Sequence, residues 1–138
     1  MRKIFGFVAA ALVTLLFCGC QSMFPPSNNH LQPEDLCAHF IADGIPVTQV
    51  QPLRTDVFHC ERGFSFQIDN KKDQEIGVYK FDIHNTKMRE QLEEYKRQGY
   101  AMFNALKFQV VVEGSFLLVG VEHNEYRQKI LDSLKTFY

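Results

Sequence analysis

The chain has 138 residues and a formal net charge of −1 at pH 7, and this length is typical of one domain. It carries no stripe of basic residues, which argues against nucleic acid as a partner. It contains 13 phenylalanines and no tryptophan. Most of its aromatic residues stand at alternating or helical positions, where core side chains are expected.

The first twenty residues have the composition of an export signal. Arg2 and Lys3 precede a largely apolar run from residue 4 to residue 17, and Gly19 then stands directly before Cys20. A membrane-spanning helix needs about 20 apolar residues, and this run is shorter. A basic start and a small-residue finish are typical of a cleaved signal. An uncleaved transmembrane helix and a plain secretory signal are the alternatives.

This segment resembles the lipobox of bacterial lipoproteins, in which a small residue precedes a lipidated cysteine and a branched aliphatic residue stands three positions before it. Gly19 fits the small position, whereas Phe17 stands where leucine is usual. The resemblance covers residues 1–20 only. It implies that residues 1–19 are a signal peptide and that Cys20 begins the mature protein and carries covalent lipid, palmitate included.

The same resemblance implies a place in the cell. Gln21 and Ser22 follow the cysteine, and neither is the aspartate that commonly retains such lipoproteins in the inner membrane. For a Gram-negative cell we therefore expect the inner leaflet of the outer membrane, with the protein facing the periplasm. Several acyl chains together give stable anchoring, which a single chain does not.

Residues 20–30 form a predicted flexible tether, because proline, serine and asparagine dominate this stretch and leave almost nothing to bury. Residues 31–138 form the predicted folded domain, which is long enough for a modest core. A helix is expected at 33–43, since proline suits a first helical position and Gly44 a left-handed cap. An edge strand is expected at 47–50 between two prolines.

The middle of the chain alternates strands and turns. Residues 57–60 and 63–69 read as the two strands of a hairpin, and 70–74 as a polar turn. Residues 75–82 read as a central strand, because apolar side chains point to both of its faces. A second helix is expected from Asn85 or Thr86 to residue 98, ended by Gly99.

The C-terminal part begins with an ambiguous apolar stretch at 100–106. Strands are expected at 108–112 and 115–121, with a turn at 113–114, and a last helix after Asn124. This order predicts an α+β fold. We expect a single small domain whose antiparallel or mixed sheet of about five to six strands has three helices packed mainly on one face.

Two cysteines, Cys37 and Cys60, remain after processing. In an oxidising compartment two cysteines tend to pair, so a disulfide is predicted. Two separate buried thiols, acting as small apolar side chains, are the alternative.

No motif for catalysis, cofactors or metals stands out. The five histidines form no close pair, and C-x-x-C, a glycine-rich phosphate loop and a serine nucleophile motif are all missing from the sequence. We therefore expect a protein that is not an enzyme and that has no cofactor beyond the lipid on Cys20. A cysteine-dependent enzyme with a free Cys37 or Cys60 is a weaker alternative.

A candidate interaction surface is predicted from aromatic and methionine side chains, which are enriched in interface cores. Its members are Tyr79, Phe81, Tyr100, Met102 and Phe103. The alternative is that these side chains complete the core. The leading functional hypothesis is a membrane-anchored, non-catalytic module that faces the periplasm or the cell exterior. It would bind an unknown envelope protein, as an accessory subunit, an exclusion or immunity factor, or an inhibitor. A carrier of a small apolar ligand is the second hypothesis.

Overall fold

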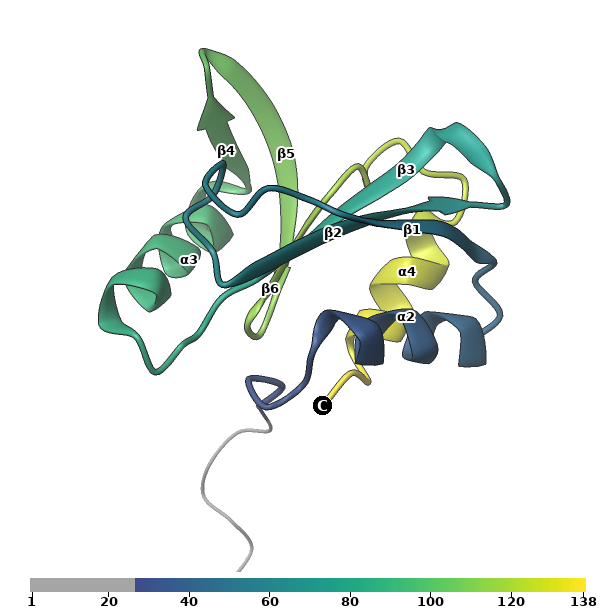
Figure 1. Ribbon diagram of the computed structural model, residues 1–138, viewed down its shortest axis with the longest axis horizontal. Helices are drawn as coiled ribbons and strands as arrows, with labels where there is room; N and C mark the ends of the chain where they lie inside the picture. Colours follow the sequence, from purple (N-terminus) through teal and green to yellow (C-terminus); the bar gives the residue numbers. More distant parts are fainter. Residues whose placement is uncertain (1–26) are drawn as a thin grey trace, which may run out of the picture.

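The computed structural model describes residues 27–138, which form three helices and six strands (Figure 1). The predicted signal, Cys20 and the first part of the tether lie outside the described residues. In chain order the elements are α2 (Pro33–Ala42), β1 (Val47–Pro52), β2 (Arg62–Ile68), β3 (Lys71–Lys80), α3 (Thr86–Gln98), β4 (Tyr100–Phe103), β5 (Leu106–Glu113), β6 (Phe116–Val119) and α4 (Arg127–Leu134).

The six strands form one antiparallel sheet in the order β1-β2-β3-β6-β5-β4. Strand β3 lies inside the sheet, between β2 and β6, and β1 lies at an edge, as the sequence predicts. The α+β class, the size of the sheet and the single small domain are thereby confirmed.

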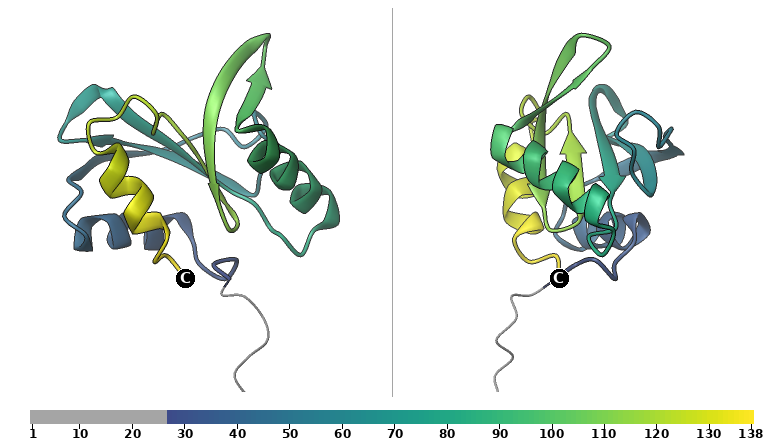
Figure 2. Two further views of the ribbon diagram at one scale, coloured as in Figure 1. Left: turned by 180° about the vertical axis from the view of Figure 1, so that it is seen from behind. Right: turned by 90° about the vertical axis from the view of Figure 1, so that its left-hand side faces the viewer.

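Both faces of the sheet are covered. Helices α2 and α4 pack on one face, and Figure 2 shows them beside each other, away from α3. Side chains alternate along a strand, so Ile76 and Val78 of β3 enter the core beneath α2 and α4. Tyr79, and Phe81 just after the strand, enter a second core beneath α3 and the loop that carries Phe58.

Local signals place the helix ends. Pro33 opens α2, and the Asp35 carboxylate accepts a hydrogen bond from the Gln32 N–H at 2.7 Å. In α3 the Asn85 side chain caps the first turn, and Gly99 ends the helix with a left-handed φ of 77°. Glycine adopts this conformation without the steric cost that a Cβ brings. These positions agree with the predicted ones.

Two strand assignments from the sequence are wrong. Residues 57–60 form a turn rather than a strand, and the hairpin partner of β2 is β3. The turn of that hairpin is Asp69–Asn70, with φ values of 55° and 56°. Aspartate and asparagine tolerate this left-handed conformation. Residues 71–73 therefore form the exposed end of β3, where nothing requires them to be apolar. Gln74 is buried, and its side-chain oxygen accepts a hydrogen bond from the Glu125 N–H at 2.8 Å.

The fold also extends further towards the N-terminus than predicted. Asn28, which the sequence assigns to the tether, is fully buried. Its Oδ1 accepts hydrogen bonds from the Ser115 N–H at 2.8 Å and the Ser115 hydroxyl at 3.0 Å. Its Nδ2 donates to the carbonyls of Glu113 and Phe137, at 3.2 and 3.3 Å. The Asn28 amide thus joins the start of the described residues to the β5–β6 turn and to the C-terminal segment.

Lys80 completes this arrangement, which we call the N-terminal clamp (Asn28, Asn29, Lys80 and Ser115). The Lys80 side chain is buried, and its Nζ donates to the Asn29 carbonyl at 2.8 Å and the Ser115 hydroxyl at 2.8 Å. Burial lowers the pKa of Lys80 from its ordinary value. The clamp therefore ties the last residues of the predicted tether to the sheet.

Candidate functional site

Two of the five predicted surface residues are core residues. Phe81 is fully buried, and Tyr79 packs edge-on against the ring of Phe58 with 4.4 Å between ring centroids. The prediction that these two side chains face a partner is wrong. Their face of the sheet is covered by α3 and by the loop between β1 and β2, and periodicity within one strand does not reveal that cover.

The other three predicted residues lie on β4, and one of them is largely exposed. The Met102 side chain has an exposed fraction of 56%, while Tyr100 and Phe103 are half-buried. The ammonium group of Lys107 lies 4.2 Å from the centroid of the Tyr100 ring, in a cation–π contact. The prediction stays open for these three side chains.

Strand β5 is shared between two partners along its length. Its first half, Leu106–Gln109, pairs with β4, and its second half, Val110–Glu113, pairs with β6. Residues 100–109 therefore form a two-stranded ribbon, here called the β4–β5 ribbon, which projects beyond the other strands (Figure 1). An isolated two-stranded hairpin is marginally stable in water, and the ribbon is supported at its base by α3, because Ala101 is buried in the core beneath that helix.

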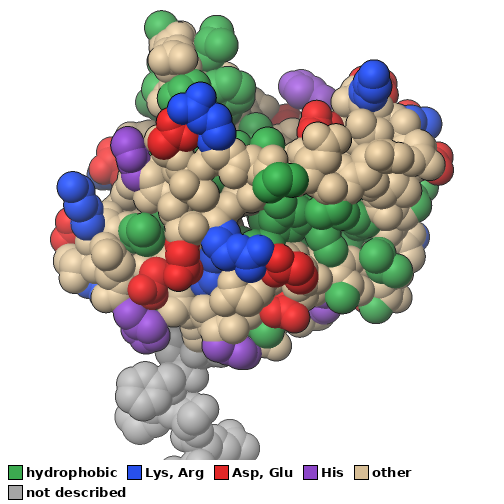
Figure 3. All heavy atoms as spheres, in the orientation of Figure 1, with side chains coloured by type: hydrophobic (Ala, Val, Ile, Leu, Met, Phe, Trp, Pro, Cys, Tyr) green, Lys and Arg blue, Asp and Glu red, His purple; other side chains and the backbone are tan. Residues whose placement is uncertain are grey.

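The ribbon is apolar and its edge is open. Leu106, which the sequence reading does not single out, has an exposed fraction of 61%. Figure 3 shows hydrophobic side chains gathered at the top of the molecule, with lysine or arginine beside them. Lys107 is the one charged residue between Gly99 and Val112. Because β4 ends the sheet, one side of its backbone pairs with no strand among residues 27–138.

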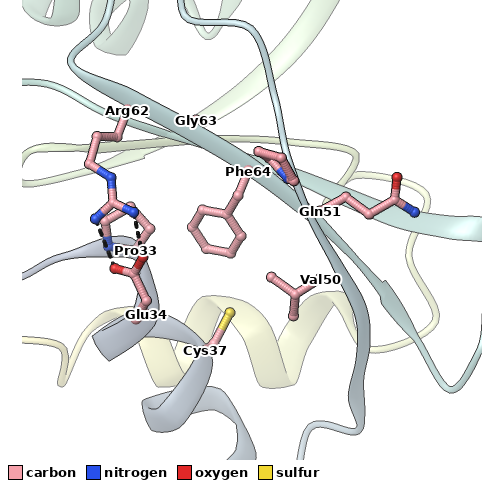
Figure 4. A pocket seen from close by; sticks show the side chains of 9 residues that line it. Pro33, Glu34, Cys37, Val50, Gln51, Arg62, Gly63 and Phe64 are labelled. Atoms are coloured by element: carbon pink, nitrogen blue, oxygen red, sulfur yellow. Dashed lines mark hydrogen bonds and ion pairs between the residues drawn. The ribbon is translucent and has the colours of Figure 1, made fainter.

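A second feature is an apolar hollow between α2 and the first two strands, here called the α2–β1 groove (Figure 4). Its volume is about 380 Å³. Its apolar lining comes from Pro33 and Cys37 of α2, Val50 and Pro52 of β1, and Phe64 of β2. Sequence reasoning does not find this groove, because its walls come from segments that are distant along the chain.

An ion pair closes one end of the groove. The Arg62 guanidinium donates two hydrogen bonds to the Glu34 carboxylate, one of them at 2.9 Å, and a third to the Gln32 side-chain oxygen at 3.3 Å. Arg62 holds the pKa of Glu34 below its ordinary value through the hydrogen bond and the opposite charge. Both side chains are exposed to solvent, so the pair itself contributes little to stability.

The two cysteines are free thiols in the structure, and the predicted disulfide is not formed. Cys37 borders the core beneath α2 and α4, whereas Cys60 belongs to the core beneath α3, so the sheet separates them. Burial raises the pKa of each thiol to about 11. At neutral pH both are protonated, which is unfavourable for a nucleophile.

Residues 27–138 contain no cluster of three or more histidine, cysteine or acidic side chains arranged to hold a metal ion. Among the described helices, none combines the length and apolarity needed to cross a membrane. Comparison of the chain with protein-family models, with curated proteins and with solved structures finds no match. Inference about function therefore starts from the ribbon, the groove and the N-terminal sequence.

Proposed function

We propose that this protein is a lipid-anchored, non-catalytic binding module of a bacterial cell envelope, and that it holds a protein partner through the β4–β5 ribbon. The observation that carries the proposal is the ribbon itself. It projects from the sheet with an open edge, and Met102 and Leu106 on it are more than half exposed. Met102 lies on the same face of the ribbon as Tyr100, and Leu106 lies on the other face with Phe103. Exposed apolar groups that cluster in this way mark interaction sites.

The ribbon favours a protein over a lipid bilayer as its partner. Hydrocarbon cannot satisfy the unpaired N–H and C=O groups of an open sheet edge, so such edges do not enter it. An extended segment of another protein can pair with them by strand addition. The alternating side chains of that segment would lie beside Met102 on one face of the ribbon, and beside Phe103, which pairs with Leu106, on the other face. Natural edges are commonly blunted by charges or proline, and β4 has neither.

The N-terminal sequence supports the anchored location. The lipobox resemblance puts lipid on Cys20, seven residues before Ser27, and seven extended residues reach at most roughly 25 Å. Figure 1 shows the start of the described chain and the ribbon at opposite ends of the domain. If the N-terminal end of the domain lies next to the membrane, the ribbon lies on the side that faces away from that membrane. This geometry suits an accessory subunit, an exclusion or immunity factor, or an inhibitor.

Site-specific photo-crosslinking in cells tests the partner. A photoreactive phenylalanine analogue replaces Met102 or Leu106 in turn, and replaces Ile41 on α2 as the control, since Ile41 has a similar exposed fraction of 57%. We expect one and the same protein to be linked from both ribbon positions and not from Ile41. An Asp substitution at the second ribbon position should abolish the adduct. Equal labelling from all three positions would contradict the proposal.

The anchor is tested separately. Metabolic labelling with a palmitate analogue should modify the wild-type chain, and Cys20→Ala should abolish the label and release the protein from the membrane fraction. Cys18→Ala is the matched control, because Cys18 would be removed with the signal. Label that survives in Cys20→Ala would refute the assignment of the lipidated residue while leaving the ribbon proposal to its own test.

A further inference from the structure

We infer that the α2–β1 groove is a binding site for a small cationic amphiphile, a molecule with an apolar chain and an ammonium head. This site lies apart from the β4–β5 ribbon and is built from other elements, so it would be a second binding function. Three features of the groove carry the inference: its lining, the backbone that shapes it, and the charge at its mouth.

The lining selects an apolar body. The ring of Phe64 forms the floor, and Pro33, Val50 and the Cys37 thiol surround it (Figure 4). At its raised pKa the thiol is neutral and acts as another apolar group. A volume of about 380 Å³ lies within the range of about 300–1,000 Å³ that is usual for small-molecule sites. A short alkyl chain or a single ring fits this space.

The backbone of β1 is distorted at the groove. The pairing of β1 with β2 shifts register between Thr48 and Gln51, which leaves Gln49 and Val50 outside the regular ladder. Gln49 has a φ of 53°, a left-handed conformation that is unfavourable for a residue with a side chain. Bulges of this kind redirect side chains next to binding sites. Here the bulge leaves Val50 over the groove with an exposed fraction of 58%, and an apolar ligand would cover it.

The charge at the mouth selects the head group. Arg62 is engaged by the Glu34 carboxylate and the Gln32 amide oxygen. The Glu34 side chain is 67% exposed, and its oxygens can accept further hydrogen bonds. The negative charge of Glu34 reaches the groove, where it contributes to raising the pKa of Cys37. Glu34 is the charged group that acts on the Cys37 thiol inside the groove. An ammonium head beside Cys37 would be attracted by Glu34, whereas a carboxylate head there would be repelled by it.

Cys37 is a built-in reporter of occupancy. The mature full-length protein is alkylated with and without hexylammonium, hexanol or hexanoate, which share a six-carbon chain and differ in the head. We expect hexylammonium to slow the alkylation of Cys37 by about tenfold at ten times its dissociation constant, because only the unoccupied fraction reacts. The rate at Cys60, in the other core, should not change. Hexanol and hexanoate should protect much less.

A charge-reversal test separates this site from nonspecific adsorption. Glu34→Gln removes the carboxylate and frees Arg62, so protection by hexylammonium should fall and protection by hexanoate should rise. Glu125→Gln is the matched control, because Glu125 is also an exposed carboxylate in an ion pair, with Lys71. No protection of Cys37 by hexylammonium would overturn the site. Equal protection by all three probes, or no change in Glu34→Gln, would overturn the assignment of the ligand class.

Discussion

Replacement of Asn28 by alanine should destabilise the whole domain, although the sequence alone assigns this residue to a flexible tether. The side chain is fully buried and bonds both to the β5–β6 turn and to the C-terminal segment. Alanine leaves the Ser115 N–H without an acceptor and removes a donor from the Phe137 carbonyl. The perturbation therefore tests whether the N-terminal clamp belongs to the cooperative fold.

The magnitude follows from these two groups. A buried polar group left without a partner costs about 1–3 kcal/mol, so we expect the free energy of unfolding to fall by about 3 kcal/mol. With an m-value of about 2 kcal/mol/M, the midpoint of urea unfolding would fall by about 1.5 M. The m-value itself should stay the same, because the rest of the domain still unfolds with the same surface exposed.

Urea unfolding followed by circular dichroism measures the effect. Ser27→Ala is the control, because Ser27 is exposed and its hydroxyl accepts one hydrogen bond, from the Asn29 N–H at 3.3 Å. Gly114→Ala should destabilise by a similar route, since a Cβ there would lie 2.1 Å from the Asn28 Oδ1 and the φ is 59°. If Asn28→Ala cost no more than Ser27→Ala, the clamp would be refuted and the fold would start further along the chain.

Three further outcomes are expected. Non-reducing mass spectrometry after alkylation in denaturant should find both Cys37 and Cys60 labelled; an unlabelled pair would show a disulfide. Burial raises the pKa of Cys60 to about 11, so between pH 9 and about pH 11 the folded protein keeps a proton that the unfolded chain releases. The contribution of Cys60 to the free energy of unfolding should therefore fall over this pH range. Unfolding measured at a series of pH values should show that Cys60→Ala lacks this contribution. If the pH dependence of the free energy of unfolding were the same in Cys60→Ala as in the wild type, the prediction would be contradicted. Gly120→Ala should lower the free energy of unfolding by about 1–3 kcal/mol, because a Cβ there would lie 2.5 Å from the Glu75 carbonyl oxygen. Gly99→Ala, which has open space around it, should cost less in thermal unfolding. Equal losses in the two variants would argue against the overlap at Gly120.

Signals within a few residues of each other determined much of the secondary structure from the sequence. Pro33 opens α2, and Asn85 and Gly99 delimit α3, because caps act on the nearest turn of the backbone. The alternation along β3 identified it as a central strand, since both of its faces carry apolar side chains. The α+β class follows from the order of these elements.

Burial was decided by the tertiary structure. Ile41 completes an apolar stripe on α2 in the sequence, yet its side chain is 57% exposed, because no neighbouring element covers that part of the helix. Tyr79 and Phe81 are buried for the opposite reason, since α3 and the β1–β2 loop pack over them. A side chain's exposure depends on what crosses above it, and the chain segments that do so are distant in sequence.

The same distinction applies to the candidate sites. The sequence by itself placed Met102 and Phe103 in an apolar stretch and predicted a lipid anchor at Cys20. Only the tertiary structure showed that β5 pairs with β6 along its second half alone, so that its first half and β4 form a projecting ribbon. Only the tertiary structure put Cys37 and Cys60 on opposite faces of the sheet, because strand pairing over long sequence separations decides which face each segment covers.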